Sequence, residues 1–226
     1  MIHIVANLKQ HLTLEDVSGY LDLFFSSTSP NPQKQLIFAP PFSLIPEFAS
    51  HHQSSAFSLS AQTVSHLTGG ANTGEVGANQ LAGLVQYCIV GHSETRKLRG
   101  LTDKDIARSV ANLLKANITP IVCVDTPYLE SQVNILKSEI LNLKSIIFAY
   151  EPVSSIGTGK PVTPGLANTI AFKIKQTTVK SAPVLYGGSV DQDNVASFIK
   201  EDNLDGVLIG TACVDPRQFA ATYNSI

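Results

Sequence analysis

The stretch SIIFAYEPVSSIGTGK, at residues 145–160, joins an apolar run to a loop of small residues. The run Ser145–Tyr150 is continuous and rich in β-branched and aromatic residues, which predicts a strand covered on both faces. Glu151 follows at once, and Thr163-Pro164 opens a helix, since proline is favoured in a first helical turn. Glu151 is therefore either a solvated charge in a turn or a base that the loop covers.

The same strand-loop-helix unit recurs along the whole chain. Eight short apolar runs are separated by amphipathic segments, and most runs lack the alternation of a half-exposed strand. We predict strands at Ile2–Ala6, Gln35–Ala39, Phe57–Ala61, Tyr87–Gly91, Pro120–Val124, Ser145–Tyr150, Pro183–Tyr186 and Gly206–Ile209.

Apolar residues at helical spacing predict helices between these strands, with the apolar stripe of each facing the core. One helix starts at Thr13–Asp16 and has the stripe Leu14, Val17, Leu21 and Phe24. A second starts at Thr102–Asp105 and has the stripe Ile106, Val110, Leu113 and Leu114. A third has the stripe Leu129, Val133, Leu136 and Ile140. Asp191 and Asp215-Pro216 are predicted caps of the last two helices, and shorter helices are expected at Leu44–His52 and Gly77–Leu84.

Eight repeated βα units predict an α/β fold, the (β/α)8 TIM barrel, with eight parallel strands and outer helices. An open doubly wound sheet is the alternative, but the chain has no glycine-rich first turn of the dinucleotide-binding type. No linker or shift in composition interrupts the pattern, so we expect a single domain over residues 1–226.

The composition narrows the classes of function. A net charge of −2 argues against a nucleic-acid or membrane-surface partner, and no apolar run approaches the length of a transmembrane helix. Residues Met1–Val5 lack the basic region of a signal peptide. The three cysteines, Cys88, Cys123 and Cys213, are too far apart for a metal motif and odd in number, which suits a reducing cytoplasm. We expect a cytoplasmic protein without a bound metal.

Polar residues follow five of the predicted strands, at the end of a barrel where active sites lie. These residues are Asn7-Leu8-Lys9, His92-Ser93-Glu94, Glu151, Gly187-Gly188-Ser189 and Gly210-Thr211. Taken singly, Lys9 is ordinarily a surface charge, His92 a structural histidine and Gly187-Gly188 a tight turn. Their convergence on one rim is the stronger reason to expect a site.

The glycine-containing strand ends predict a phosphate site. Backbone N–H groups at Gly188-Ser189 and Gly210-Thr211 can bind a dianion, and Gly157 in the loop after Glu151 can add another. A carboxylate, an imidazole and an ammonium group beside a phosphate indicate proton abstraction next to a carbonyl in a small phosphorylated substrate.

Seven segments of the chain also resemble the triosephosphate isomerase family over nearly the whole length. They are Asn7-x-Lys9, Ala39-Pro40-Pro41, Ala61-Gln62, Gly70-Ala71-x-Thr73-Gly74-Glu75, Ile89–Glu94, Tyr150–Val153 with Ile156–Lys160, and Tyr186–Val190. Asn-x-Lys alone is uninformative, whereas the His-Ser-Glu and Tyr-Glu-Pro-Val segments together are specific.

The resemblance implies the interconversion of dihydroxyacetone phosphate and D-glyceraldehyde 3-phosphate through an enediolate, without a cofactor, in glycolysis and gluconeogenesis. It implies that Glu151 is the base, that His92 is a neutral electrophile and that Lys9 stabilises negative charge. Asn7 would hold the substrate or Lys9, and Glu94 would lie close to Lys9 and adjust the electrostatics of the site.

The resemblance further implies a lid and a homodimer. The lid would span Pro152–Val162, with Tyr186 and Ser189 holding it closed; its residues include Pro152, Val153, Ser154, Ile156, Gly157, Thr158, Gly159 and Lys160. The dimer contact would come from the loop at Gly70–Glu75, where Thr73, Gly74 and Glu75 reach the Asn-x-Lys region of a neighbouring subunit.

The chain departs from the family pattern around the lid. Ser154 stands where the family usually has tryptophan, and Pro161 restricts the second hinge, so we expect lid motion to shift toward Ser154. Asp125-Thr126 replaces the usual Gly-Glu, and Thr211 replaces a glycine of the phosphate loop. Two other functions stay open on the residues: another sugar-phosphate enzyme, such as a lyase or synthase, and a non-catalytic barrel.

Overall fold

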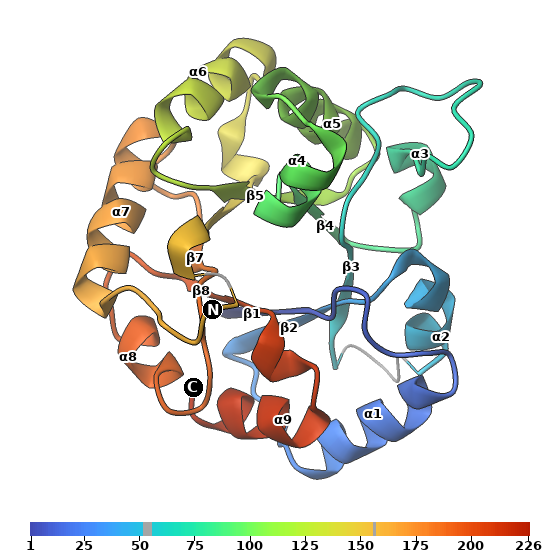
Figure 1. The fold of residues 1–226 in the computed structure, drawn as a ribbon, viewed down its shortest axis with the longest axis vertical. Coiled ribbons are helices and arrows are strands. Elements are labelled where there is room, and N and C mark those ends of the chain that lie inside the picture. The colour runs from blue at the N-terminus through green and yellow to red at the C-terminus, as the bar shows by residue number, and fades with distance from the viewer. Residues whose placement is uncertain (52–55, 156) are drawn as a thin grey trace.

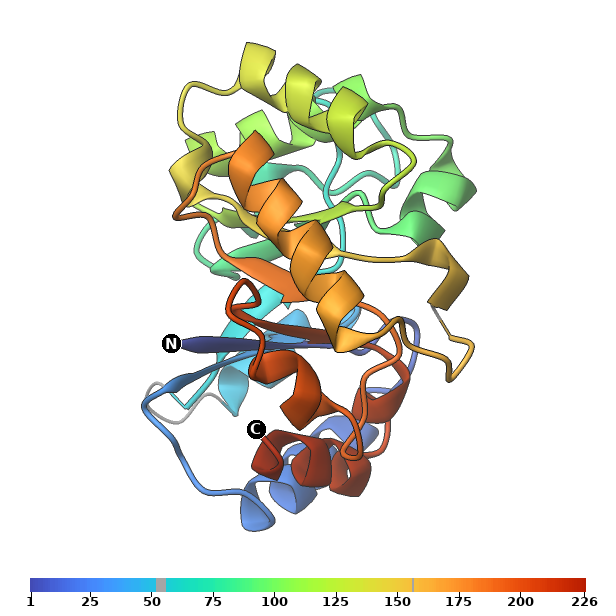
Figure 2. The same ribbon diagram turned by 90° about the vertical axis from the view of Figure 1, so that its left-hand side faces the viewer.

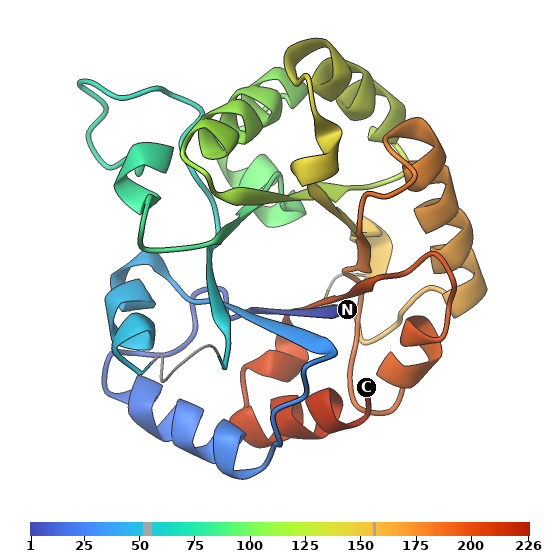
Figure 3. The ribbon, with the colours of Figure 1, turned by 180° about the vertical axis from the view of Figure 1, so that it is seen from behind.

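The structure is a computed structural model that describes residues 1–51, 56–155 and 157–226. Within these residues, eight parallel strands close into a barrel in which each strand pairs with the next and β8 pairs with β1 (Figures 1 and 3). The strands are β1 (Ile2–Asn7), β2 (Lys34–Ala39), β3 (Ser58–Ala61), β4 (Tyr87–Val90), β5 (Thr119–Val124), β6 (Ile147–Tyr150), β7 (Val184–Tyr186) and β8 (Gly206–Ile209). The predicted barrel and its eight strands are confirmed.

Strand ends differ from the prediction by one or two residues. The largest shift is at β6, which begins at Ile147 because Leu143–Ser145 forms a 3-10 turn and pairing with β5 starts at Ile121. Ile146, between this turn and the strand, is apolar and buried, so sequence alone does not separate it from the strand.

The barrel has a core on each side of its sheet, as a parallel sheet covered on both faces requires. Inward-facing residues of the strands fill the barrel itself: Val5, Ile37, Ala39, Ile89, Ile121, Cys123, Ile147, Ala149, Leu185 and Leu208. Their neighbours along each strand, such as Ile4 and Ala6 beside Val5, pack outward against the helices. The continuous apolar runs in the sequence follow from this double burial.

Helices surround the barrel (Figure 1). They are α1 (Asp16–Ser26), α2 (Ile45–Ser50), α3 (Ala78–Leu81), α4 (Ser93–Arg99), α5 (Asp103–Lys115), α6 (Leu129–Glu139), α7 (Pro164–Thr177), α8 (Val195–Ile199) and α9 (Pro216–Asn224). No helix in the described ranges is both long and apolar enough to cross a membrane. Part of the predicted segment Leu44–His52 lies outside the described residues, since His52 is not described.

Side-chain caps explain several helix starts. Thr102 accepts from the N–H of Asp105 while the Asp105 carboxylate accepts from the N–H of Thr102, which forms a capping box for α5. The Thr163 side chain caps α7 and the Asp215 side chain caps α9, each by accepting from N–H groups of the first helical turn, as the sequence predicts. The predicted cap at Asp191 is wrong for α8: that helix begins later, with Asn194 at the N-cap, and the Asp191 side chain instead accepts from two N–H groups of the preceding turn.

Two features of the helices differ from expectation. Leu14 is 60% exposed, because Thr13 and Asp16 form a turn that delays α1 until Asp16 and leaves Leu14 outside the helix. The helix α4 was not predicted, since none of its residues is buried and its sequence carries no apolar stripe.

The first and last helices join the two ends of the chain through aromatic packing. Phe24 of α1 stacks on Phe219 of α9, with ring centroids 4.8 Å apart, and contacts Phe38 and Tyr223 edge-on. These contacts cover the seam where β1 meets β8, so they stabilise the closure that brings the strand ends to one rim.

We predict that Phe24→Ala lowers the free energy of unfolding by about 3–5 kcal/mol, because it leaves a cavity among rings that are fully buried. Its neighbour Leu23 is 41% exposed and provides the control. Urea denaturation should show a loss below about 1 kcal/mol for Leu23→Ala. Equal losses for the two variants would contradict this role for the cluster.

Candidate active site

A pocket opens at the carboxyl ends of the strands, and it contains most of the predicted site. Figure 2 shows the N-terminus of β1 at one end of the barrel and the loop after β6 at the other. The pocket is lined by Asn7, Lys9, His92, Gly157, Gly159, Gly187, Gly188, Ser189, Val190, Asp191, Leu208, Gly210, Thr211, Ala212 and Gln218. Glu151 lies behind this surface, fully buried.

Glu151 is held by its backbone and left free at its carboxylate. Its N–H donates to the Val124 oxygen at the end of β5, at 2.9 Å. Within the described residues, neither carboxylate oxygen makes a hydrogen bond of ordinary geometry, although the Cys123 thiol and the Ser93 N–H lie near enough to favour the ionised form. Burial raises the pKa of Glu151, and the nearby His92 and Cys123 partly oppose that shift. A desolvated carboxylate of this kind is a stronger base than one in water.

Gly187 makes room for this carboxylate, a role that the sequence analysis missed. A Cβ atom at position 187 would lie 2.8 Å from the Glu151 Cγ atom, too close for two carbons. The adjacent Gly188 is restricted in the same way, since a Cβ there would lie 2.0 Å from the Tyr186 hydroxyl oxygen. The sequence showed only a Gly-Gly pair, which is equally typical of a tight turn.

His92 presents an N–H to the same space. Its Nδ1 atom accepts a hydrogen bond from the backbone N–H of Glu94 at 3.2 Å, in the first turn of α4. A ring nitrogen that accepts carries no proton, so the proton of the neutral imidazole lies on Nε2. That atom is 3.4 Å from the Glu151 Oε1 atom. The histidine and the carboxylate are therefore close neighbours, with His92 in the pocket wall and Glu151 buried behind it.

Lys9 lies on the opposite wall in a constrained backbone conformation. Its φ is 49°, and its N–H donates to the Asn7 side chain at 3.2 Å. The Lys9 ammonium nitrogen is 2.5 Å from the Glu94 Oε1 atom. Gln62 donates to the carbonyl oxygens of Lys9 and Ala39, each at 2.8 Å, and so anchors this turn to β2. In the sequence, Gln62 stands out only as part of the motif Ala61-Gln62, which does not indicate this anchoring role.

The glycine-containing strand ends lie beside Lys9, as the phosphate hypothesis requires. Gly188, Ser189, Gly210 and Thr211 all line the pocket, and a Cβ at Gly210 would lie 3.3 Å from the Lys9 Cε atom. Thr211 is exposed, so its side chain has room in spite of replacing a glycine. Among the lining residues, Asp191 and Gln218 were not anticipated as part of the pocket wall.

The loop after Glu151 is tied to the barrel at three points. The Val153 N–H donates to Asp125 at 3.1 Å, and the Val162 N–H donates to the Tyr186 hydroxyl at 3.1 Å. Between them, the Ser189 hydroxyl donates to the Ser155 oxygen at 2.6 Å. Tyr186 and Ser189 thus contact the loop at its two sides.

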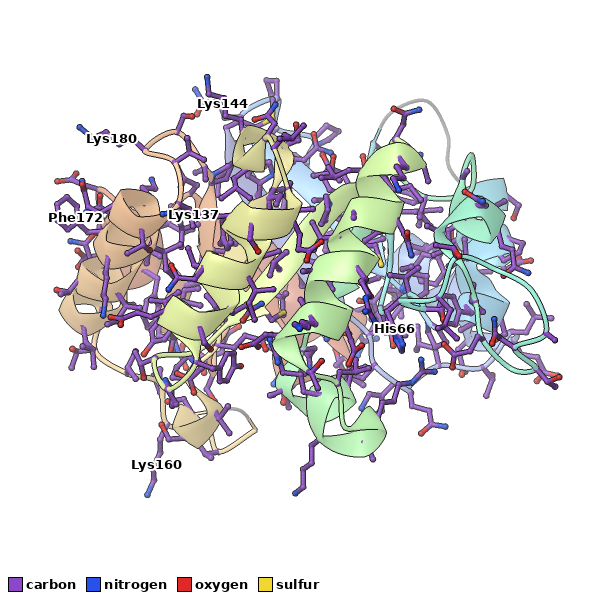
Figure 4. The ribbon with its side chains drawn as sticks, turned by 90° about the horizontal axis from the view of Figure 1, so that it is seen from above. His66, Lys137, Lys144, Lys160, Phe172 and Lys180 are labelled. Atoms are coloured by element: carbon purple, nitrogen blue, oxygen red, sulfur yellow. The ribbon has the colours of Figure 1, made fainter. Side chains whose placement is uncertain are left out.

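Within the predicted lid the residues differ in exposure. Pro152 is buried, whereas Val153, Ser154, Gly157, Thr158, Gly159, Lys160 and Pro161 are exposed. Figure 4 shows the Lys160 side chain extending from the loop away from the body of the protein. Gly157 and Gly159 have φ values of 68° and 69°, which favour glycine. Ile156 lies outside the described residues.

The predicted dimer loop stands apart from the barrel, between β3 and α3 (Figure 1). Thr73 and Gly74 are exposed, and Glu75 is partly buried beside Arg99, whose Nη1 atom lies 3.4 Å from the Glu75 Oε1 atom. The loop therefore offers small polar groups to solvent in this single chain.

Comparison with known proteins gives one consistent family. A family model described as triosephosphate isomerase matches residues 2–226. A triosephosphate isomerase from a Synechococcus species is 34% identical, over 99% of this chain and 94% of its own length. The enzyme of Mesomycoplasma hyopneumoniae is 32% identical over 96% of both chains. That of Gloeobacter violaceus is 31% identical over 98% of this chain and 97% of its own length.

We predict that Glu151→Gln stabilises the folded protein at pH 7 by about 1 kcal/mol or more, because an ionised carboxylate is costly in this position. Burial raises the pKa of Glu151, so the folded state holds this proton more tightly than the unfolded chain does. The stability of the native protein relative to the variant should therefore improve as the pH falls toward about 4, where the unfolded carboxyl group is also protonated.

Urea denaturation at one protein concentration measures this difference at several pH values. The exposed Glu15 provides the control, and Glu15→Gln is expected to change the free energy of unfolding by less than about 0.5 kcal/mol throughout. A destabilised Glu151→Gln variant at pH 7 would show that the carboxylate is stabilised in a way that the structure does not contain.

Proposed function

The chain belongs to the triosephosphate isomerase family and interconverts dihydroxyacetone phosphate and D-glyceraldehyde 3-phosphate, and we propose that the residues of the rim pocket perform this reaction. The observation that supports this most is the pairing of a buried, unpartnered Glu151 carboxylate with the Nε2 atom of His92, 3.4 Å away. The reaction is a step of glycolysis and gluconeogenesis.

Glu151 is the base in this proposal. It takes a proton from the carbon next to the substrate carbonyl and returns it to the neighbouring carbon, through an enediolate. Its burial supports the role, since a desolvated carboxylate binds a proton more strongly and loses no water at the moment of reaction. The protonated Glu151 that forms in the first step is the acid of the second.

His92 and Lys9 stabilise the negative charge that develops on the substrate oxygens. The proton on His92 Nε2 hydrogen-bonds the carbonyl oxygen, and the Glu94 N–H bond to Nδ1 keeps the ring in the tautomer that can donate there. The Lys9 ammonium adds a positive charge, with Asn7 holding its backbone and Glu94 its side chain. Charge complementarity is worth most where water is excluded.

The phosphate of the substrate binds to N–H groups of Gly188, Ser189, Gly210 and Thr211 in this proposal, with Gly157 adding one from the loop. Lys9 lies close to Gly210, so its positive charge also attracts the phosphate dianion. The loop Pro152–Val162 then covers the site. Dry closure matters because an enediolate phosphate in contact with water can eliminate phosphate.

We propose further that residues 1–226 act as one domain, in the cytoplasm and as a homodimer. Cys88, Cys123 and Cys213 are free and buried, which suits a reducing compartment. The exposed loop with Thr73 and Gly74 supports a contact with a second copy of the chain.

A coupled isomerase assay tests the assignment of the base. We predict that Glu151→Asp folds normally but loses activity about 100-fold, which corresponds to about 2.7 kcal/mol of transition-state stabilisation, because the shorter side chain withdraws the carboxylate from the substrate carbon. Glu15→Asp, on the exposed surface, is the matched control and should keep wild-type activity. Background turnover by folded wild type would reject the function, and full activity of Glu151→Asp would reject Glu151 as the base.

Light scattering tests the oligomeric state. At micromolar concentration we expect the mass of two chains, and we expect Thr73→Arg to shift the population toward the monomer, because a long charged side chain would not fit a close contact between subunits. The same substitution at Thr169, an exposed residue of α7, should leave the mass unchanged, because α7 lies on the other side of the barrel from this loop (Figure 1). A wild-type monomer at this concentration would refute the dimer.

A further inference from the structure

The carboxylate of Asp125 connects the end of β5 to the first residues of the lid. Asp125 follows the strand directly and is only 7% exposed. Its Oδ2 atom accepts from the Val153 N–H at 3.1 Å, and its Oδ1 atom accepts from the Thr126 N–H at 2.7 Å. The two residues joined by the first bond are 28 positions apart in the chain. Both oxygens are thus committed to backbone donors.

The end of β5 also holds Glu151, the residue that precedes Pro152. The Val124 carbonyl oxygen accepts from the Glu151 N–H at 2.9 Å, so the last residue of β5 binds the N–H of Glu151 and the next residue, Asp125, binds that of Val153. Pro152 between them is buried and has no N–H of its own. Two adjacent residues of one rigid strand end therefore set the backbone on both sides of the lid's first residue.

This contact depends on a residue in which the chain departs from its family. A glycine at position 125, as in the usual Gly-Glu pair, has no side chain that could reach Val153. The position of the usual tryptophan is occupied here by Ser154, which is exposed and makes no side-chain hydrogen bond to the described residues. Within the described residues, the first turn of the lid is therefore anchored by the Asp125 carboxylate at the strand end.

We propose that Asp125 is a positioning residue that fixes the first turn of the lid and, through Pro152, the backbone of Glu151. The proposal rests on the proposed function of Glu151 as the base. Asp125 touches no substrate; it acts by holding Val153, so that the lid closes with its first turn already in place. The conformational freedom that the lid must lose on closing is smaller as a result.

A lid without this anchor should admit water to the enediolate. In the side reaction, an electron pair of the enediolate oxygen forms a carbonyl, the carbon-carbon double bond of the enediolate shifts to the neighbouring pair of carbons, and the carbon-oxygen bond to phosphate breaks. Inorganic phosphate leaves with the electrons of that bond, and the remaining enol tautomerises to a dicarbonyl compound. The phosphate released per isomerisation therefore reports how well the lid excludes water.

The test compares Asp125→Ala and Asp125→Asn with a control, Thr126→Val. Asparagine offers only one carbonyl oxygen, so it can accept from Val153 or from Thr126 but not from both. Thr126→Val removes the Thr126 hydroxyl, 3.3 Å from Oδ1, and leaves the Val153 bond in place. The measurements are kcat, KM, inorganic phosphate released per turnover, and hydrogen exchange at the Val153 amide.

We expect Asp125→Ala to lower kcat about tenfold, to raise phosphate release per turnover about tenfold and to leave KM within about threefold. Asp125→Asn should fall between Asp125→Ala and wild type, and Thr126→Val should stay within about twofold of wild type. The Val153 amide should exchange faster in Asp125→Ala and at the wild-type rate in Thr126→Val.

Two results would overturn the proposal. One is an Asp125→Ala variant that melts at a lower temperature but keeps the wild-type kcat and phosphate release. That result would mean that Asp125 stabilises the fold without positioning the lid. The other is a Val153 amide that exchanges equally fast in wild type and variant. The exchange measurement needs no activity, so an inactive wild type would refute the proposed function while leaving this contact open to test. If Asp125→Ala does not fold, Asp125→Asn provides the same readouts.

Discussion

The site depends on one constraint: a carboxylate that is buried without a hydrogen-bond partner. Glu151 is fully buried, and its oxygens have no hydrogen-bond partner within the described residues. Water would stabilise the ionised form and weaken it as a base, so removing water raises its pKa at the expense of folding free energy. The surrounding residues serve this state. Gly187 leaves the space that the side chain fills, Val124 holds its backbone, and the His92 Nε2 atom lies 3.4 Å from its carboxylate.

The barrel supplies the free energy that such a site requires. Its strands are buried on both faces, and its seam is covered by aromatic packing between α1 and α9. A closed sheet has no free edge, so the carboxyl ends of its strands keep their relative positions while the loops beyond them differ from relative to relative. Side chains at or close to strand ends gain that rigidity, such as Glu151 directly after β6 and His92 two residues after β4.

The charged groups of the site differ in exposure. Lys9 and Glu94 are bonded to each other at the edge of the pocket, where solvent reaches them, whereas Glu151 lies where it does not. The exposed pair orients an ammonium group toward the pocket at little electrostatic cost, and the buried group retains its reactivity. Asp125 and Tyr186 accept hydrogen bonds from the N–H groups of Val153 and Val162, near the two ends of the predicted lid.

Local patterns were sufficient for the barrel and for the polar residues at its rim, because buried parallel strands read as continuous apolar runs and their ends are marked by polar residues and glycines. They failed for α4, which has no buried residue, and for Leu14, which a capping turn excludes from its helix. The bond between Asp125 and Val153 and the space at Gly187 were decided only by the tertiary structure. Both are contacts between different strand ends. Their distances depend on the register of the closed barrel, and a local sequence pattern carries no information about that register.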